Sequence, residues 1–142
     1  MVKKFYSFEL KNDLSELERL CRTCEEIGQD INISDRTIFE MNLALDELFT
    51  NIISYGFNDH QEHTIKMSIT VEGDQLQMRI EDDGVPFNPL ASKTPEFQCG
   101  IEECKIGGLG IHLIRKLMDD VQYKRVADKN ILVLRRKMRK ED

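Results

Sequence analysis

The alternating stretch from His63 to Gly84 constrains the fold of this chain more than any other feature. Its sequence, HTIKMSITVEGDQLQMRIEDDG, places apolar residues at every second position on both sides of the short polar segment EGDQ. This pattern predicts two strands joined by a tight turn, an antiparallel hairpin with one face on the core. A similar alternation over residues 121–138, VQYKRVADKNILVLRRKM, predicts a second hairpin that turns near ADKN.

Helical periodicity appears in the stretches that precede the first hairpin. Residues 12–28, NDLSELERLCRTCEEIG, repeat apolar residues at helical spacing, with Asn12 or Asp13 as the N-cap and Gly28 as the expected stop. Residues 32–57, NISDRTIFEMNLALDELFTNIISYGF, predict a longer helix that is capped by Ser34 and ended by Gly56.

A third helix is expected over residues 107–119, GGLGIHLIRKLMD, and an alternating strand over residues 2–10, VKKFYSFEL. The element order is therefore β-α-α-β-β-loop-α-β-β. Antiparallel hairpins with segregated helices indicate an α+β fold, a two-layer α/β sandwich with a mixed sheet and its helices on one face. A length of 142 residues suits one domain that spans residues 1–142.

The composition is that of an ordinary soluble protein, with 40% apolar and 32% charged residues. The net charge of -6 and the sequence pI of about 5.2 disfavour binding to nucleic acid or to an anionic membrane. The basic C-terminal stretch LRRKMRKED is interpreted as a last strand and a solvated tail. Neither a signal peptide nor a bilayer-spanning stretch is seen, so a cytoplasmic protein without a membrane partner is expected.

Four cysteines allow two interpretations. Cys21 and Cys24 form a C-x-x-C pair inside a helical pattern, and Cys99 and Cys104 lie in a loop-like stretch. Both pairs together could build a zinc site, or the first pair could be redox-active. The simpler interpretation is reduced thiols, two of which pack as small apolar side chains.

Residues 84–107 break all periodicity and contain the three prolines, Pro86, Pro89 and Pro95. A loop of this length in a small domain is usually functional or mobile.

The helix predicted over residues 32–57 carries a carboxylate and an amide one turn apart. Its apolar face comprises Met41, Ala44, Leu45, Leu48, Ile52 and Tyr55. Glu47 and Asn51, at positions i and i+4, project together along one border of that face. An asparagine oxygen suits Mg²⁺, and a neighbouring glutamate can accept a proton during phosphoryl transfer. The alternative is that both side chains simply solvate a helix edge.

Two further stretches carry groups suited to a nucleotide. Asp82 ends a strand just before Gly84, where a carboxylate can accept a hydrogen bond from an exocyclic amine and a glycine lets a flat ring approach the backbone. Gly107, Gly108 and Gly110 open a helix whose free amides can bind phosphate. Taken alone, the first stretch can also be a strand that ends in turn residues. The second can also be a flexible hinge into the helix, and a glycine-rich helix start by itself is weak evidence.

The order of the three motifs is more specific than any one of them: Glu-x-x-x-Asn on a helix, Asp-x-Gly after a strand, a long loop, then Gly-Gly-x-Gly before a helix. This order resembles the ATP-binding fold shared by gyrase, the Hsp90 chaperone, histidine kinases and MutL. Within that superfamily the short chain and DDGVPFNP…GGLGIHLIRKLMDDVQY…NILVL look most like the anti-sigma-factor serine/threonine kinases. The resemblance covers essentially the whole chain.

The resemblance implies a role for each motif. The family's general base falls on Glu47, its Mg²⁺ ligand on Asn51 and its adenine-binding aspartate on Asp82. The other nucleotide positions fall on Gly84, on Phe87 after Pro86, and on Gly107, Gly108, Leu109 and Gly110. A lid over the triphosphate would run from about Asn88 to Ile106, with Lys93 and Lys105 within it.

The implied activity is that of a protein serine/threonine kinase that uses ATP and Mg²⁺. Family members phosphorylate an anti-sigma-factor antagonist in a partner-switching pathway, bind a sigma factor alternatively, and commonly form homodimers. A non-catalytic module that senses ATP or ADP and controls a partner by docking is the alternative, although the presence of Glu47 favours a kinase. A third interpretation, a small α+β scaffold without nucleotide, leaves the co-occurrence of the motifs unexplained.

Overall fold

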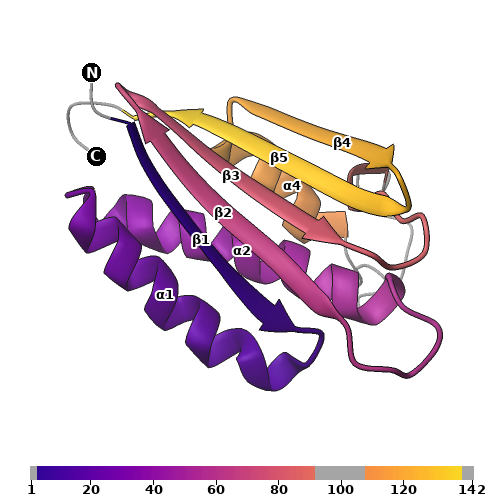
Figure 1. The fold of residues 1–142 in the computed structure, drawn as a ribbon. Helices are drawn as coiled ribbons and strands as arrows, with labels where there is room; N and C mark the ends of the chain where they lie inside the picture. The colour runs from indigo at the N-terminus through magenta and orange to yellow at the C-terminus, as the bar shows by residue number, and fades with distance from the viewer. Residues whose placement is uncertain (1–2, 92–107, 139–142) are drawn as a thin grey trace.

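Within residues 3–91 and 108–138, which this computed structural model describes, five strands form one sheet and three α-helices cover one of its faces (Figure 1). The elements in chain order are β1 (Lys3–Lys11), the 3-10 turn η1 (Leu14–Glu16), α1 (Leu17–Asp30), α2 (Asp35–Tyr55), β2 (Thr64–Glu72), β3 (Gln75–Asp82), η2 (Pro89–Ala91), α4 (Gly108–Leu117), β4 (Asp120–Val126) and β5 (Lys129–Lys137). The expected α+β sandwich with helices on one face is confirmed.

The strand order is β1-β2-β3-β5-β4, and every neighbouring pair is antiparallel. A mixed sheet was expected, and the connections explain the difference. Two helices separate β1 from β2. The chain therefore starts β2 at the end of the sheet where β1 stops, and the two strands pair antiparallel. β3 and β4 flank α4 and do run parallel, but β5 lies between them, so the parallel strands are not neighbours.

Both predicted hairpin turns are confirmed. Glu72 pairs with Gln75 around a turn in which Gly73 has a φ of 61°, a conformation that suits glycine. Val126 pairs with Lys129 around Ala127 and Asp128, whose φ values of 49° and 65° match a type I′ turn.

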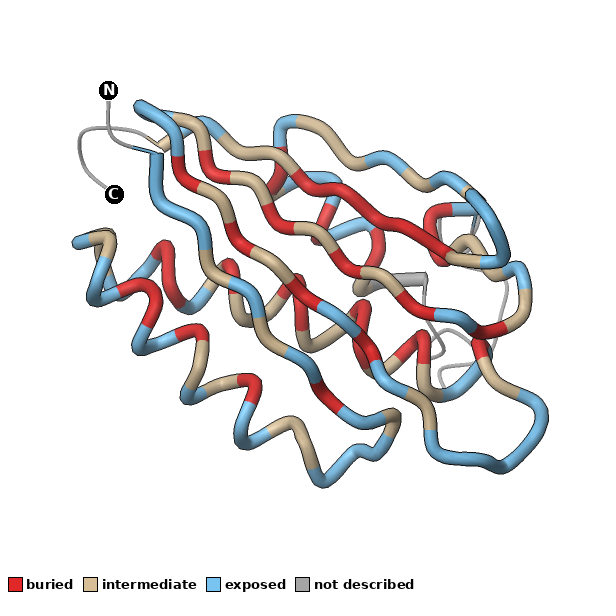
Figure 2. Tube along the Cα trace, in the orientation of Figure 1, coloured by how far each residue is buried: buried red, intermediate tan, exposed pale blue. Residues whose placement is uncertain are grey.

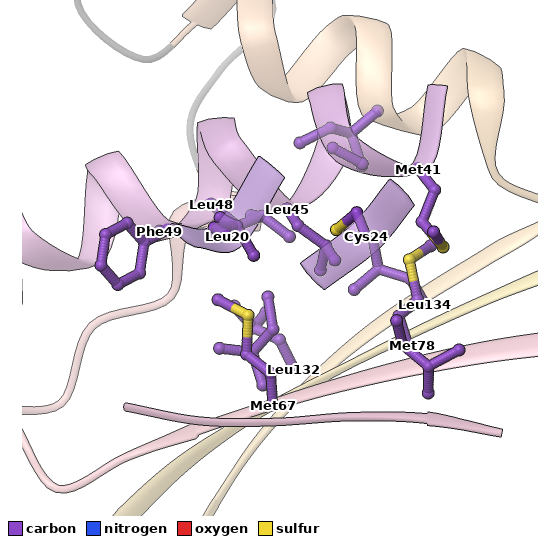
Figure 3. Close-up of a cluster of buried hydrophobic side chains, with 14 of the residues drawn as sticks. Leu20, Cys24, Met41, Leu45, Leu48, Phe49, Met67, Met78, Leu132 and Leu134 are labelled. Carbon is purple, nitrogen blue, oxygen red and sulfur yellow. The ribbon is translucent and has the colours of Figure 1, made fainter. Parts of the chain in front are cut away.

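The core lies between the sheet and the helix layer, and burial alternates along β2 and β3 as the sequence pattern predicts (Figure 2). Fully burying one such apolar side chain contributes about 1.5–3 kcal/mol, so this layer supplies the main stabilising term. Figure 3 shows the side chains that meet there, which include Leu20 and Cys24 from α1, Met41, Leu45, Leu48 and Phe49 from α2, and Met67, Met78, Leu132 and Leu134 from the sheet.

Ser34 caps α2 as expected, since its hydroxyl accepts a hydrogen bond from the Thr37 amide at 3.1 Å. Gly28 does not end α1, which continues to Asp30. The helix ends instead where Asn32 takes a φ of 61°, and the Ile33 amide donates to the Gly28 carbonyl at 3.1 Å, as in a Schellman motif.

Gly28 serves helix packing. A Cβ at this position would lie 2.3 Å from Cγ1 of Ile38, so the absence of a side chain lets α1 approach α2 closely.

Cys21 and Cys24 are both free thiols in α1. Burial is the main cause that raises the pKa of both, that of Cys24 to about 12, so both are protonated at neutral pH. This agrees with packed, reduced thiols, while Cys99 and Cys104 lie outside the described residues.

Among the helices of the described ranges, none is long and apolar enough to cross a membrane.

Candidate functional site

The side of α2 that carries Glu47 and Asn51 faces α4. The Asn51 amide nitrogen donates to the Glu47 carbonyl at 2.8 Å and to Glu47 Oε1 at 3.0 Å. A Cβ on Gly110 would lie 2.0 Å from Glu47 Oε1, so the glutamate occupies the space that the glycine leaves open. The first and third predicted motifs therefore meet.

Asn51 is more buried than a residue on a helix rim, with 7% of its surface exposed, while Glu47 is half-buried. The edge of the apolar face is in fact a second interface, because α4 packs against this side of α2. Within the described residues no donor contacts Asn51 Oδ1, so the amide is held through its nitrogen and its oxygen stays available. An oxygen in that state suits a hard cation such as Mg²⁺.

Tyr55 departs from its expected place in the apolar face, since it is 46% exposed. It lies one turn beyond Asn51, near the end of α2, and its ring centroid is 5.8 Å from that of Phe87. The pair connects the end of α2 with the segment that follows β3.

Asp82 and Asn130 form a buried polar pair at the end of the β3–β5 ladder, where they lie directly opposite each other. They are 3% and 2% exposed. Asp82 Oδ1 accepts hydrogen bonds from the Asn130 side-chain nitrogen and from the Gly84 amide, both at 2.9 Å. Burial raises the pKa of Asp82, while these two bonds act in the opposite direction and favour the carboxylate.

Asn130 is a site residue that the motifs did not reveal. Its side-chain nitrogen also donates to the Val85 carbonyl at 2.8 Å, and its oxygen accepts from the Tyr123 hydroxyl at 2.6 Å and from the Phe87 amide at 3.3 Å. One signal was available in the sequence. Residue 130 shares the inward-facing register of Leu132 and Leu134, so a polar side chain there demands buried partners.

The turn after Asp82 is held against the end of α2. The Val85 amide donates to the Gly56 carbonyl at 2.8 Å, and a Cβ on Gly84 would lie 2.1 Å from that carbonyl oxygen. Arg125 of β4 donates to the Gly84 carbonyl at 2.8 Å. Gly84 is therefore required for a backbone-to-backbone contact.

His63 is held between two carboxylates beside this turn. Its Nε2 lies 2.7 Å from Asp59 Oδ2 and its Nδ1 lies 3.0 Å from Asp83 Oδ1. Both ring nitrogens can donate only in the charged imidazolium, which also stacks on Phe57 with ring centroids 4.5 Å apart. The pKa of His63 is raised, first by the hydrogen bond to Asp59 and also by that to Asp83.

Part of the predicted site cannot be placed. Gly107, the lysines Lys93 and Lys105, and most of the expected lid lie outside the described residues. Gly108 begins α4, and Leu109 follows it in that helix.

Replacement of Asn130 by alanine should destabilise the protein by at least about 2 kcal/mol, because it leaves buried donors and acceptors without partners. Tyr123→Phe removes one of the same hydrogen bonds and should cost only about 0.5–1.5 kcal/mol. Urea denaturation of both variants measures the difference. Equal losses of stability would mean that the other hydrogen bonds of Asn130 do not hold these buried groups in place.

The His63 clamp predicts a pH-dependent stability. A histidine whose folded pKa is raised stabilises the protein fully below its unfolded pKa of about 6.5, and the contribution is lost as the pH rises through the folded pKa. The free-energy difference between wild type and His63→Gln should therefore shrink as the pH rises from 5.5 to above the folded pKa. Denaturant titrations along this pH series test it, and a constant or growing difference would contradict the assignment.

Comparison with known proteins is consistent with this geometry. Residues 10–136 match the model of the histidine kinase-like ATPase domain. The chain is 30% identical to the serine-protein kinase RsbW of Bacillus mycoides over 141 residues, covering 94% of this chain and 86% of that kinase. It is 31% identical to RsbW of Listeria innocua over 101 residues, 68% of this chain, and the match spans 64% of the length of that relative.

A solved structure supports the fold. The blue-light activated histidine kinase EL346 of Erythrobacter litoralis superimposes with a TM-score of 0.59 and 18% identity, over 87% of this chain and 41% of that one. The chain belongs to the histidine kinase-like ATPase family, with relatives among the serine-protein kinases named RsbW.

Proposed function

We propose that this chain is an ATP-dependent protein serine/threonine kinase of the anti-sigma-factor type. The observation that carries the proposal is the contact of Glu47 with both Asn51 and Gly110, on a helix whose end is tied to the turn after Asp82. The names of the RsbW relatives support a serine kinase, and the family implies ATP binding.

Asp82 is proposed to bind the adenine. Its Oδ1 is occupied by Asn130 and Gly84, which fixes the carboxylate plane and leaves Oδ2 as the acceptor for the exocyclic amine. Gly84 lies against the Gly56 carbonyl, which fixes the backbone beside that carboxylate. Phe87 and Tyr55 offer aromatic surface at the same border.

Asn51 is the proposed Mg²⁺ ligand through Oδ1. The donor set fits, since Mg²⁺ takes few protein oxygens and completes its shell with phosphate and water. Bound there, the ion would neutralise charge on the phosphates. Gly107, Gly108, Leu109 and Gly110 would place the start of α4 against the same phosphates.

Glu47 is the proposed general base. It accepts the hydroxyl proton of a serine or threonine on a partner protein while the oxygen bonds to the γ-phosphorus and the bond to the ADP oxygen breaks. The amide of Asn51 orients the carboxylate through Oε1, and Gly110 leaves it room.

The proposed substrate is an antagonist of an anti-sigma factor, with a sigma factor as the alternative partner. The setting would be the cytoplasm and the active form a homodimer of one-domain chains. This part of the proposal rests on the resemblance to anti-sigma-factor kinases and on the relatives named RsbW.

Asp82→Asn should weaken ATP binding at least about 30-fold, because the amide presents donors to the amine and disturbs the pair with Asn130. The neighbouring variant Asp83→Asn weakens the exposed contact with His63 but leaves the hydrogen bonds of Asp82 in place, so it should bind ATP as wild type does. Calorimetry with and without Mg²⁺ measures both. If wild type binds no ATP, or if Asp82→Asn binds equally well, the adenine assignment is wrong.

Glu47→Gln should retain ATP affinity within about threefold and reduce phosphoryl transfer at least about 100-fold, since glutamine cannot accept the proton. Glu81→Gln, a half-buried glutamate paired with Arg79 on the opposite sheet face, is the matched control and should transfer normally. Radiolabelled ATP and the partner that wild type phosphorylates provide the assay. Normal transfer by Glu47→Gln would refute the base. Transfer by none of the proteins, with ATP affinity intact, would favour a nucleotide-sensing module.

A further inference from the structure

A groove between α1 and α2 takes no part in the proposed site. It has a volume of about 370 Å³ and is lined by Cys21, Glu25 and Gln29 of α1 and by Asp35, Ile38, Phe39 and Asn42 of α2. The two helices lie side by side along the sheet in Figures 1 and 2. On α2 the groove residues lie on the side facing α1, whereas Glu47 and Asn51 face α4.

An exposed aromatic ring marks the groove. Phe39 is 65% exposed, although it sits beside the buried Ile38. Burying a phenylalanine ring is strongly favourable, so a partner that covers this ring gains a substantial part of its binding free energy there.

An unsatisfied polar atom lies in the same groove. Asn42 Oδ1 is buried, and it has no hydrogen-bond partner among the described residues. A buried acceptor without a donor is destabilising, so rotation of this amide toward an occupant that supplies an N–H would remove the destabilisation.

The charge of the groove identifies the kind of occupant. Glu25 and Asp35 line it, and Asp46 lies near enough to raise the pKa of Cys21 together with Glu25. No lysine or arginine belongs to the described lining, and Arg36, which follows Asp35, pairs with Glu40. An acidic groove with an apolar ring complements a basic, apolar segment.

We infer that this groove binds a segment of a partner protein that covers Phe39 with an apolar side chain, sets arginine or lysine against Glu25 and Asp35, and donates an N–H to Asn42 Oδ1. The inference does not depend on kinase activity.

The probe is a labelled 16-residue amphipathic helical peptide with a leucine stripe flanked by arginines, and a twin in which glutamate replaces every arginine. Fluorescence anisotropy should show binding of the arginine peptide, weakened by salt, and at least tenfold weaker binding of the glutamate twin. Phe39→Asp should lose at least tenfold in affinity. Phe5→Asp, which alters a ring that is 63% exposed on β1, should lose none.

A second pair of variants separates charge from packing. Glu25→Lys should weaken binding several-fold, while Glu26→Lys, on an exposed neighbour outside the groove, should not. Asn42→Leu should keep the fold and also weaken binding, and the peptide should shift the side-chain amide signal of Asn42 in wild type.

Several results would overturn the inference: no binding of the arginine peptide, equal binding of its twin, or Glu25→Lys and Asn42→Leu proteins that bind as wild type does. A wild type that self-associates in sedimentation, with Phe39→Asp monomeric, would assign the groove to a second copy of the chain and also overturn it. ATP calorimetry on every variant keeps this test separate from the proposed function, because the groove variants should bind ATP normally.

Discussion

The hydrogen bond from the Val85 amide to the Gly56 carbonyl is the contact on which the site depends. It joins the end of α2 to the turn after β3 without any side chain between them, and Gly84 permits this because a Cβ would collide with the Gly56 oxygen. The helix carries Glu47 and Asn51, and the strand carries Asp82. Fixing the two elements at this point sets the distance between the groups proposed to act on phosphate and the group proposed to bind adenine.

The sheet positions Asp82 because the row of apolar side chains on its helix-facing side ends in a polar residue. Leu76, Met78 and Ile80 of β3 face the helices, and Asp82 continues that row opposite Asn130. A carboxylate in this position costs stability unless it is hydrogen-bonded, and the Asn130 amide and the Gly84 amide meet that demand. The carboxylate proposed to bind adenine is thus oriented before any ligand arrives.

Features that depend on residues within about four positions of one another could be predicted from the sequence. The hairpins, the Ser34 cap and the pairing of Glu47 with Asn51 all follow from local spacing. The burial of Asn51, the exposure of Tyr55 and the contact of Gly110 with Glu47 depend on how α4 packs on α2, which local spacing does not encode. The antiparallel sheet likewise depends on the insertion of β5 between β3 and β4, a matter of topology.

Residues that act through distant partners were missed for the same reason. Asn130 serves Asp82 from 48 positions away, and His63 meets Asp83 across 20. Asp82 itself was predicted because a motif surrounds it, whereas Asn130 has no motif and is marked only as a polar residue in an inward register.

The central claim is that Asp82 recognises adenine by its exocyclic amine, and the most direct test compares the affinities of ATP and inosine triphosphate. At the base the two nucleotides differ in that a keto oxygen replaces the exocyclic amine and the adjacent N1 carries a hydrogen. Because that oxygen would face a carboxylate acceptor, inosine triphosphate should bind at least about tenfold more weakly, a loss of 1.4 kcal/mol or more. Equal affinities would show that Asp82 does not bind the amine and would contradict the account.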